Sequence, residues 1–240
     1  MPIFLYNFFH RETNDKTEGN QLSIPRHDAY RFQKHPRARS SRIFPSVNLP
    51  EVKDSFVRDI LSQSQFHETL PERQTVNLQV LANILLCGYG VLRKSSQQHR
   101  TVPSLGGRYP IGMYVFLFEQ LGACRPGLYW YNASEHQLEL LVLKFFSLHE
   151  RRIFAPLEWP VATRVLICLT LFLPLSIEGY GSRGYRYSLF EAGHIAQNMI
   201  LAGAELGKRC IPLEGISEWE IESTLGLNTD EERVLSAWCL

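Results

Sequence analysis

The fold is decided by residues 100–118, which read RTVPSLGGRYPIGMYVFLF. The second half of this stretch, 111–118, is rich in aromatic and β-branched residues, which is typical of a central strand. In the first half, Gly106 and Gly107 let the backbone come close to a flat ligand, and Ser104 offers a hydroxyl group beside them. The pattern alone leaves two interpretations open: a ligand-binding loop, or an ordinary glycine-rich turn before a strand.

Apolar periodicity on either side of this stretch predicts both helices and strands. Asn77 is expected to cap a helix that ends at Gly88 or Gly90, and Ser217 with Glu220 to form a capping box. The helices are expected over 78–86, 187–206 and 217–225, and the strands over 128–131, 138–142, 165–173 and 234–239, with a hairpin link at 132–135.

The chain is expected to form one domain with an N-terminal extension. Residues 1–50 read as an extended arm, because the part from 14 to 46 is rich in Arg, His, Ser, Asn and Pro and lacks apolar periodicity. Residues 51–240 start with a helical pattern and show no internal repeat, so they are expected to fold around one core.

Charge and hydrophobicity exclude two classes of partner. Lys and Arg number 25 against 24 Asp and Glu, so the net charge is +1 and no overall field would hold a nucleic acid. The most apolar run, 165–175, is too short to cross a bilayer, and the first residues do not resemble a targeting segment. We therefore expect a cytoplasmic protein with no membrane or nucleic-acid partner.

The five cysteines do not form a recognisable ligand or disulfide pattern. Their number is odd and no two have CxxC spacing, so free thiols in a reducing compartment are favoured over a disulfide framework or zinc site. They are Cys87, Cys124, Cys168, Cys210 and Cys239. The chain also has no Walker loop, GxSxG or HExxH motif, which leaves kinase and hydrolase functions without support.

Two further clusters carry polar and aromatic side chains. Residues 180–187, YGSRGYRY, precede the predicted long helix and suit either stacking on an aromatic ligand or docking of a surface loop on its own domain. Inside that helix lie Glu191, His194, Gln197 and Asn198. Glu191 and His194 resemble half of a metal-ligand set, but no second pair accompanies them, so a structural network is favoured and no metal is predicted.

The order of four segments is more informative than any one of them. They read RTVPSLGGRYPIGMYVFLF (100–118), PGLYWYNASEHQLELL (126–141), YGSRGYRYSLFEAGHIAQNMILAGAELG (180–207) and IPLEGISEWEIESTLGL (211–227). With this order, the chain from about Ile60 onward resembles the SagB-type, microcin B17 dehydrogenase-like family. This family comprises FMN-dependent azoline dehydrogenases of the nitroreductase superfamily.

The resemblance implies an α+β fold with a nitroreductase-like mixed, mainly antiparallel sheet flanked by helices. It implies an intertwined homodimer that binds FMN at the subunit interface, in residues 51–240. The implied activity is the two-electron oxidation of thiazoline- or oxazoline-type rings in a ribosomal peptide natural-product pathway, with molecular oxygen reoxidising the flavin. The implied partners are a peptide substrate and a cyclodehydratase subunit.

The resemblance also assigns residues to the site. Tyr180 matches the tyrosine of a Lys-Tyr pair that transfers the proton, and Arg183 is the nearest cation along the chain that could activate it. Residues that match the family's FMN contacts are Arg100, Pro103, Ser104, Gly106, Gly107, Gln197, Asn198, Leu213, Glu214 and Gly215.

The chain departs from the family pattern at three places. Gly179 replaces the Lys of the Lys-Tyr pair, and the sequence around Gly215 reads LEG where the family more often has two glycines. Residues 63–68, QSQFHE, contain none of the arginines expected to hold the FMN phosphate, so that role would pass to Arg73, Arg183 or Arg186. Two alternative functions follow: a non-catalytic flavin-fold scaffold in a peptide-modifying complex, or an NAD(P)H-dependent nitro or quinone reductase.

Overall fold

A computed structural model describes residues 60–61, 74–93, 99–154, 163–213 and 215–240. The predicted N-terminal arm over 1–50, the segment 63–68, Arg73 and Glu214 lie outside the described residues.

The centre of the fold is a six-stranded sheet with the order β5-β4-β3-β6-β8-β7, in which every described pairing is antiparallel. The strands are β3 (Ile111–Leu117), β4 (Gly127–Asn132), β5 (Gln137–Leu143), β6 (Val165–Phe172), β7 (Ile211–Pro212) and β8 (Glu232–Cys239). A separate two-stranded sheet pairs β1 (Val91–Arg93) with β2 (His99–Arg100).

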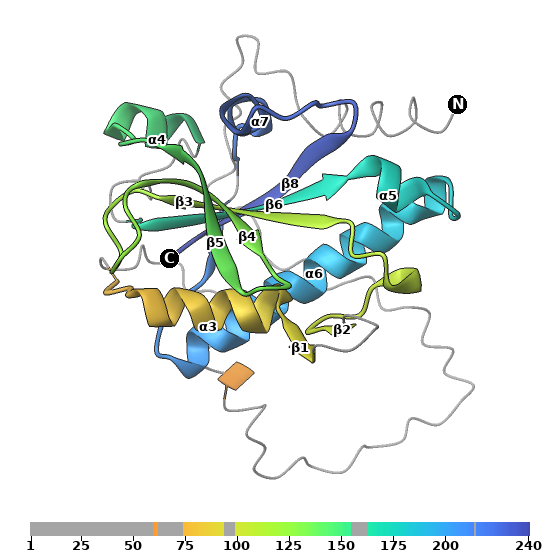
Figure 1. The fold of residues 1–240 in the computed structure, drawn as a ribbon, viewed down its shortest axis with the longest axis horizontal. Coiled ribbons are helices and arrows are strands. Elements are labelled where there is room, and N and C mark those ends of the chain that lie inside the picture. The colour runs from red at the N-terminus through yellow and green to blue at the C-terminus, as the bar shows by residue number, and fades with distance from the viewer. Residues whose placement is uncertain (1–59, 62–73, 94–98, 155–162, 214) are drawn as a thin grey trace, which may run out of the picture.

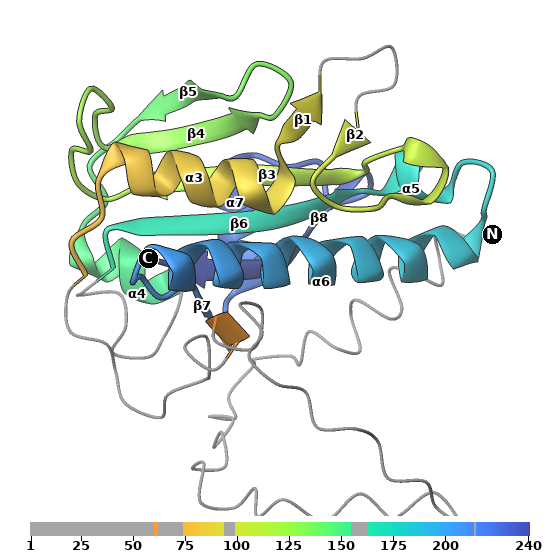
Figure 2. The ribbon, with the colours of Figure 1, turned by 90° about the horizontal axis from the view of Figure 1, so that it is seen from below.

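Helices cover both faces of the large sheet. Figures 1 and 2 show α3 and α6 side by side on one face, and Figure 1 shows α4 and α7 on the opposite face. A short helix, α5, joins β6 to α6 at one end of the sheet. The helices are α3 (Leu78–Tyr89), α4 (Leu148–Phe154), α5 (Leu173–Ile177), α6 (Ser182–Glu205) and α7 (Glu218–Leu225).

Burial on both faces explains the unbroken apolar sequence of β3. Successive strand residues point to opposite faces. Met113 and Val115 therefore pack in the core cluster shared with α3 and α6, whereas Tyr114 and Phe116 pack in the cluster shared with α7. All residues of β3 are buried, which is why the sequence shows no polar alternation there.

The predicted fold class is confirmed, and so are most of the predicted elements. Helix α3 begins after Asn77, whose side chain accepts a hydrogen bond of 2.9 Å from the amide of Val80. The predicted hairpin corresponds to β4 and β5, and the predicted last strand to β8. All five cysteines are free thiols, and three of them are buried. None of the helices in the described part of the chain is long and apolar enough to span a membrane.

The predicted start of the long helix was wrong. Helix α6 begins at Ser182 instead of residue 187, so most of the segment 180–187 is helical and not a loop. Glycine at position 184 explains the early start, because a Cβ there would collide with the carbonyl oxygen of Ser176 in α5. Gly184 thus allows α6 to begin directly against α5, a requirement that is tertiary and invisible in local sequence.

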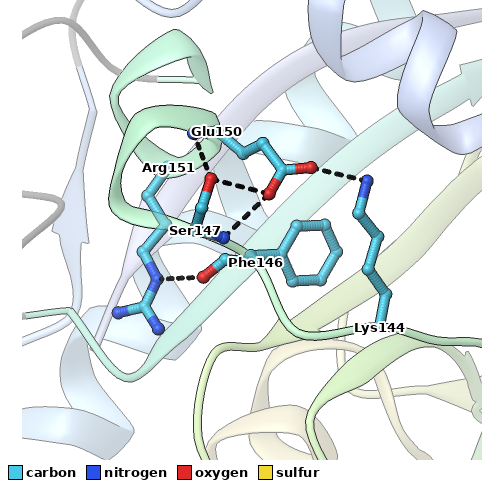
Figure 3. A network of polar contacts seen from close by, with 5 residues as sticks. All are labelled: Lys144, Phe146, Ser147, Glu150 and Arg151. Carbon is cyan, nitrogen blue, oxygen red and sulfur yellow. Dashed lines mark hydrogen bonds and ion pairs between the residues drawn. The ribbon is translucent and has the colours of Figure 1, made fainter.

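The capping box was predicted at the wrong helix. Ser217 occupies the N-cap position of α7 but makes no side-chain capping bond. At α4, the Ser147 hydroxyl accepts from the amide of Glu150 at 3.2 Å, and the Glu150 carboxylate accepts from the amide of Ser147 at 2.8 Å (Figure 3). Hydrogen bonds from Lys144 and Ser147 lower the pKa of Glu150 to about 2. The Ser-x-x-Glu signal at 147–150 was present in the sequence.

Candidate active site

The glycine-rich loop before β3 forms a tight turn. A 3-10 turn spans Leu105–Gly107, with φ values of 66° at Gly106 and 63° at Gly107. These left-handed conformations favour glycine, so both glycines are needed for the turn itself. The amide of Gly107 donates to the carbonyl of Ser104 at 3.0 Å. The loop is therefore a tight turn, and its role in binding a ligand stays a prediction.

A buried polar group holds this loop against α6. The hydroxyl of Ser104 accepts from the amide of Tyr109 at 2.9 Å, and its proximity to Glu191 lowers the pKa of that carboxyl group, against the larger effect of burial. Tyr89 donates to Glu191 Oε1 at 2.7 Å, and only 3% of Glu191 is exposed. Burial raises the pKa of Glu191 and that of Tyr89. The Ser104 hydroxyl, predicted to face a ligand, is thus used inside the protein.

Tyr180 lies directly over the loop. A Cβ placed on Gly106 would lie 2.6 Å from the Tyr180 hydroxyl oxygen. The guanidinium carbon of Arg108 lies 5.6 Å from the centre of the Tyr180 ring, and Arg108 pairs with Glu178 at 2.6 Å. The small hollow at this place is lined by Ser104, Leu105, Arg108, Pro110, Tyr180 and Glu191, among others. The structure therefore brings together the predicted loop and the predicted catalytic tyrosine.

Arg108 is a residue of this site that the sequence analysis missed. Gly179, with φ of 80°, would place a Cβ only 3.1 Å from Arg108 Nη2. The guanidinium group thus occupies space beside position 179 that a longer side chain there would need. Arg108 lies within the quoted motif, but its partner Glu178 is 70 positions away, so only the fold joins them.

Arg183 lies next to Tyr180 through the backbone. Its amide donates to the Tyr180 carbonyl at 3.2 Å, and within the described part of the chain no hydrogen bond or cation–π contact joins its exposed side chain to the phenol. Its catalytic role stays a prediction.

The glycines at 179, 181 and 184 form a GxGxxG pattern, which the sequence analysis overlooked. This spacing follows α5 instead of a strand, so it lacks the context of a dinucleotide-binding loop.

Arg100 and Thr101 leave buried polar atoms unpaired. The guanidinium carbon of Arg100 lies 4.1 Å from the Tyr89 ring centre and 4.9 Å from that of Tyr109. In the described part of the chain, Arg100 Nε and Thr101 Oγ1 are buried and have no hydrogen-bond partner. Asn198 of α6 donates to the Thr101 carbonyl at 3.3 Å, which holds this segment in place.

Leu213, Gly215 and Gln197 are the remaining predicted flavin contacts among the described residues. Leu213 follows β7, where its amide donates to the carbonyl of Ala237 at 2.9 Å, and Gly215 has φ of 66°. Neither residue lines the hollow beside Tyr180. Gln197 is exposed on α6, as is His194.

The donor set fits one part of a flavin. Buried atoms without partners at Arg100 and Thr101 would suit the carbonyl and nitrogen atoms of a flavin ring, and a Cβ on Gly107 would meet nothing within 4 Å. Arg108 supplies positive charge beside the loop. No group of three side chains suited to a metal occurs in the ranges that the structure describes.

A family model and two relatives match this chain. The model of the Nitroreductase family matches residues 70–240. The nitroreductase-like protein MJ1384 of Methanocaldococcus jannaschii is 27% identical over 180 residues, covering 75% of this chain and 88% of that protein. The trifolitoxin-processing protein TfxB of Rhizobium leguminosarum bv. trifolii is 27% identical over 184 residues. That match covers 72% of this chain but 49% of TfxB, so the chain spans about half of that relative.

Two solved structures share the fold. A chain of the E. coli microcin synthetase McbBCD complex, solved with truncated pro-MccB17 bound, has a TM-score of 0.74 at 17% identity. This match covers 99% of the present chain and 91% of that chain. A nitroreductase-like protein of Ralstonia eutropha JMP134 has a TM-score of 0.63 at 22% identity, covering 80% and 86% of the two chains.

Proposed function

The chain belongs to the nitroreductase family, and on this premise we propose that it is an FMN-dependent dehydrogenase of thiazoline- or oxazoline-type rings in a ribosomally made peptide. Members of the family typically bind flavin. The observation that carries the proposal is the contact between Tyr180 and Gly106, which puts an ionisable hydroxyl against the loop suited to a flat cofactor.

The relatives support a peptide as the substrate. TfxB is a trifolitoxin-processing protein, and the E. coli complex of similar fold is a microcin synthetase with a truncated precursor bound. Both act in or belong to systems named for modified peptides. A peptide substrate and a neighbouring cyclodehydratase subunit are therefore the partners that we propose for this chain.

The loop and α6 are the elements that would hold FMN. The backbone of Pro103, Gly106 and Gly107 would lie along the ring, with Thr101 and the exposed amide of Gln197 as polar contacts. When bound, FMN would supply the two-electron acceptor for the hydride that leaves the azoline ring. The protein's own contribution is to orient the substrate ring and to accept its proton.

Tyr180 is proposed to accept that proton as a phenolate. One C–H bond of the ring gives up a hydride, the adjacent C–H bond gives its proton to Tyr180, and the electron pair left behind forms the new ring double bond. A phenolate needs nearby positive charge, and the guanidinium group of Arg108 lies 5.6 Å over the Tyr180 ring. Arg108 is thus a better-placed cation than Arg183 to stabilise the phenolate.

A second copy of the chain would complete the site. Leu213 packs in the core cluster shared with α7, whereas α6 packs in the other cluster, although Leu213 matches an FMN contact in the resemblance. Helix α6 exposes 43% of Leu189 and 59% of Phe190, and a Cβ on Gly193 would meet nothing within 4 Å. An apolar helix face with small residues suits packing against its own copy. We therefore propose a homodimer formed through α6.

An NAD(P)H-dependent nitro or quinone reductase is the second candidate. The relation to MJ1384 favours it, because that relative is nitroreductase-like and 88% of its length is covered. The same fold and cofactor would serve both activities, with opposite directions of electron flow. Substrate oxidation and nicotinamide oxidation must therefore be measured separately.

The proposed function is tested by product analysis. The purified chain, loaded with FMN, is incubated in air with a synthetic peptide that contains one thiazoline. The proposal predicts loss of two hydrogens from the peptide and formation of one hydrogen peroxide per azole. An unchanged peptide, with rapid NADPH oxidation in the presence of a quinone, would instead establish the reductase.

A further inference from the structure

A cavity of about 370 Å³ adjoins the hollow beside Tyr180. Pro110 and Leu175 line both spaces, so the two are neighbours. Of the residues predicted to contact flavin, only Arg100 lines this cavity. Its walls carry the aromatic side chains of Tyr89, Tyr109, Trp130, Tyr131 and Phe172. The cavity is therefore a separate aromatic space next to the proposed catalytic group.

Arg100 is a preorganised hydrogen-bond donor in this cavity. Two tyrosine rings hold its guanidinium group, with centre distances of 4.1 Å and 4.9 Å. Its Nε is buried and has no hydrogen-bond partner among the described residues. A buried donor without a partner is costly unless a ligand supplies the acceptor. Arg100 also lines the cavity, so its guanidinium group can donate to a ligand with a carbonyl oxygen or another acceptor.

Glu232 gives the cavity an acceptor of opposite charge. Its carboxylate accepts from Thr170 Oγ1 at 2.5 Å and from the Tyr114 hydroxyl at 3.5 Å, and it also lines the cavity. A carboxylate disfavours a phosphate or another multiply charged anion nearby. A neutral amide suits the pair, because its oxygen accepts from Arg100 and its N–H can donate to a carboxylate.

We propose that this cavity binds a planar heterocycle together with its carboxamide group, as an azole or azoline in a peptide presents it. The aromatic walls stack on the ring, and Arg100 donates to the carboxamide oxygen. The volume lies near the lower end of the roughly 300–1,000 Å³ of ligand pockets, which suits one ring and its amide. This assignment rests on the proposed function and makes Arg100 a substrate contact instead of a flavin contact.

The test is calorimetric titration of the full FMN-loaded chain with thiazole-4-carboxamide. Saturable binding is expected, with thiazole lacking the carboxamide binding about tenfold more weakly or worse, because a hydrogen bond to a charged donor is lost. Arg100→Met should weaken carboxamide binding by a similar factor. Arg125 is exposed and precedes the start of β4, whereas the cavity is lined by residues at the other end of that strand. Arg125→Met should therefore leave the affinity for the carboxamide unchanged.

Several outcomes would overturn the assignment. They are equal affinity in Arg100→Met and wild type, equal affinity for thiazole and its carboxamide, or binding of nicotinamide but not of the thiazole compound. If Arg100→Met does not fold, Arg100→Lys keeps the positive charge but replaces the planar guanidinium fork with a compact ammonium, and it should weaken carboxamide binding by a smaller factor than Met would. If either Arg100 variant still binds the carboxamide but no longer retains FMN, Arg100 contacts the flavin and not the substrate.

The titration separates this inference from the proposed function. If the chain neither retains FMN nor oxidises a thiazoline, the dehydrogenase proposal fails, yet the same titration can be run on the flavin-free chain to test carboxamide binding. If turnover is present but Arg100→Met binds the carboxamide as tightly as wild type, the cavity assignment alone fails.

Discussion

The hydroxyl oxygen of Tyr180 lies 2.6 Å from the point that a Cβ on Gly106 would occupy. The two residues are 74 positions apart in the sequence (180 − 106), and they meet because α5 and the turn into α6 lie over the loop before β3. The absence of a side chain at position 106 therefore sets where the phenol can rest. This contact links the loop to the proposed proton acceptor.

Substitution of the two loop glycines should separate backbone strain from steric displacement of Tyr180. Gly106→Ala and Gly107→Ala both put a side chain on a left-handed residue, which costs about 1–2 kcal/mol of folding stability. Only the Gly106 variant also pushes on Tyr180, because a Cβ on Gly107 meets nothing within 4 Å. Turnover of a thiazoline peptide should fall much further in Gly106→Ala. If Gly106→Ala and Gly107→Ala are equally stable and show equal turnover, the contact between Gly106 and Tyr180 does not matter for activity.

Removal of the Tyr180 hydroxyl should affect chemistry more than cofactor binding. Tyr180→Phe is expected to lower turnover by about 10²-fold or more, since loss of a general base typically costs 10²–10⁴-fold. Its FMN content, read from visible absorbance, should stay close to that of wild type. Tyr129→Phe removes a hydroxyl that donates only to the Arg125 carbonyl and serves as the control. Parallel loss of FMN and turnover would deny Tyr180 a catalytic role.

The buried carboxyl group of Glu191 should make stability depend on pH. Burial raises its pKa in the folded protein above the ordinary 4.5, so the folded state holds the proton more tightly than the unfolded chain. This stabilisation is present below pH 4.5 and is lost as pH rises through the folded-state value. The unfolding free energy of Glu191→Gln should therefore rise relative to wild type over that window.

Urea unfolding at a series of pH values measures this difference. The matched control is Glu205→Gln, at an exposed carboxylate on the same helix. A pH-independent difference between Glu191→Gln and wild type would mean that Glu191 does not hold its proton more tightly in the folded state.

Two glycines of α6 should respond to alanine in opposite ways. A Cβ on Gly184 would collide with the Ser176 carbonyl, so Gly184→Ala should destabilise the chain by about 1–3 kcal/mol through overpacking. Within one chain Gly193 has open space around it, so at a concentration where sedimentation shows only monomer, Gly193→Ala should stabilise the helix by about 0.5–1 kcal/mol. Thermal unfolding of both variants, with sedimentation to follow any change in assembly, checks the pair. Similar effects at both positions would contradict the packing of α5 against α6.

Local sequence predicted the elements whose pattern is set by burial. The strand over 111–118 and the hairpin at 132–135 were found, because apolar runs and turn residues report burial and chain reversal directly. The start of α6 was not found, because Gly181 and Gly184 look like loop residues unless the approach of Ser176 is known. The capping box at Ser147 and Glu150 was visible in the sequence and overlooked.

The candidate site could be predicted only where the residues lie close in sequence. The loop glycines and Tyr180 were named from motifs, but Arg108 became part of the site through Glu178, which the fold brings beside it. The cavity around Arg100 draws on α3, β3, β4, β6 and β8, and no periodicity in the sequence joins these segments. The Ser104 hydroxyl likewise lies near Glu191 of α6 inside the protein, and only the fold brings these two residues together.

The most direct test of the central claim is an anaerobic visible spectrum of the FMN-reconstituted chain mixed with a thiazoline-containing peptide. The account predicts stoichiometric bound flavin whose absorbance bleaches with the peptide, recovers when air is admitted, and bleaches far more slowly with NADPH. A chain that fails to retain FMN, or a bound flavin that NADPH bleaches and the peptide leaves oxidised, would contradict it.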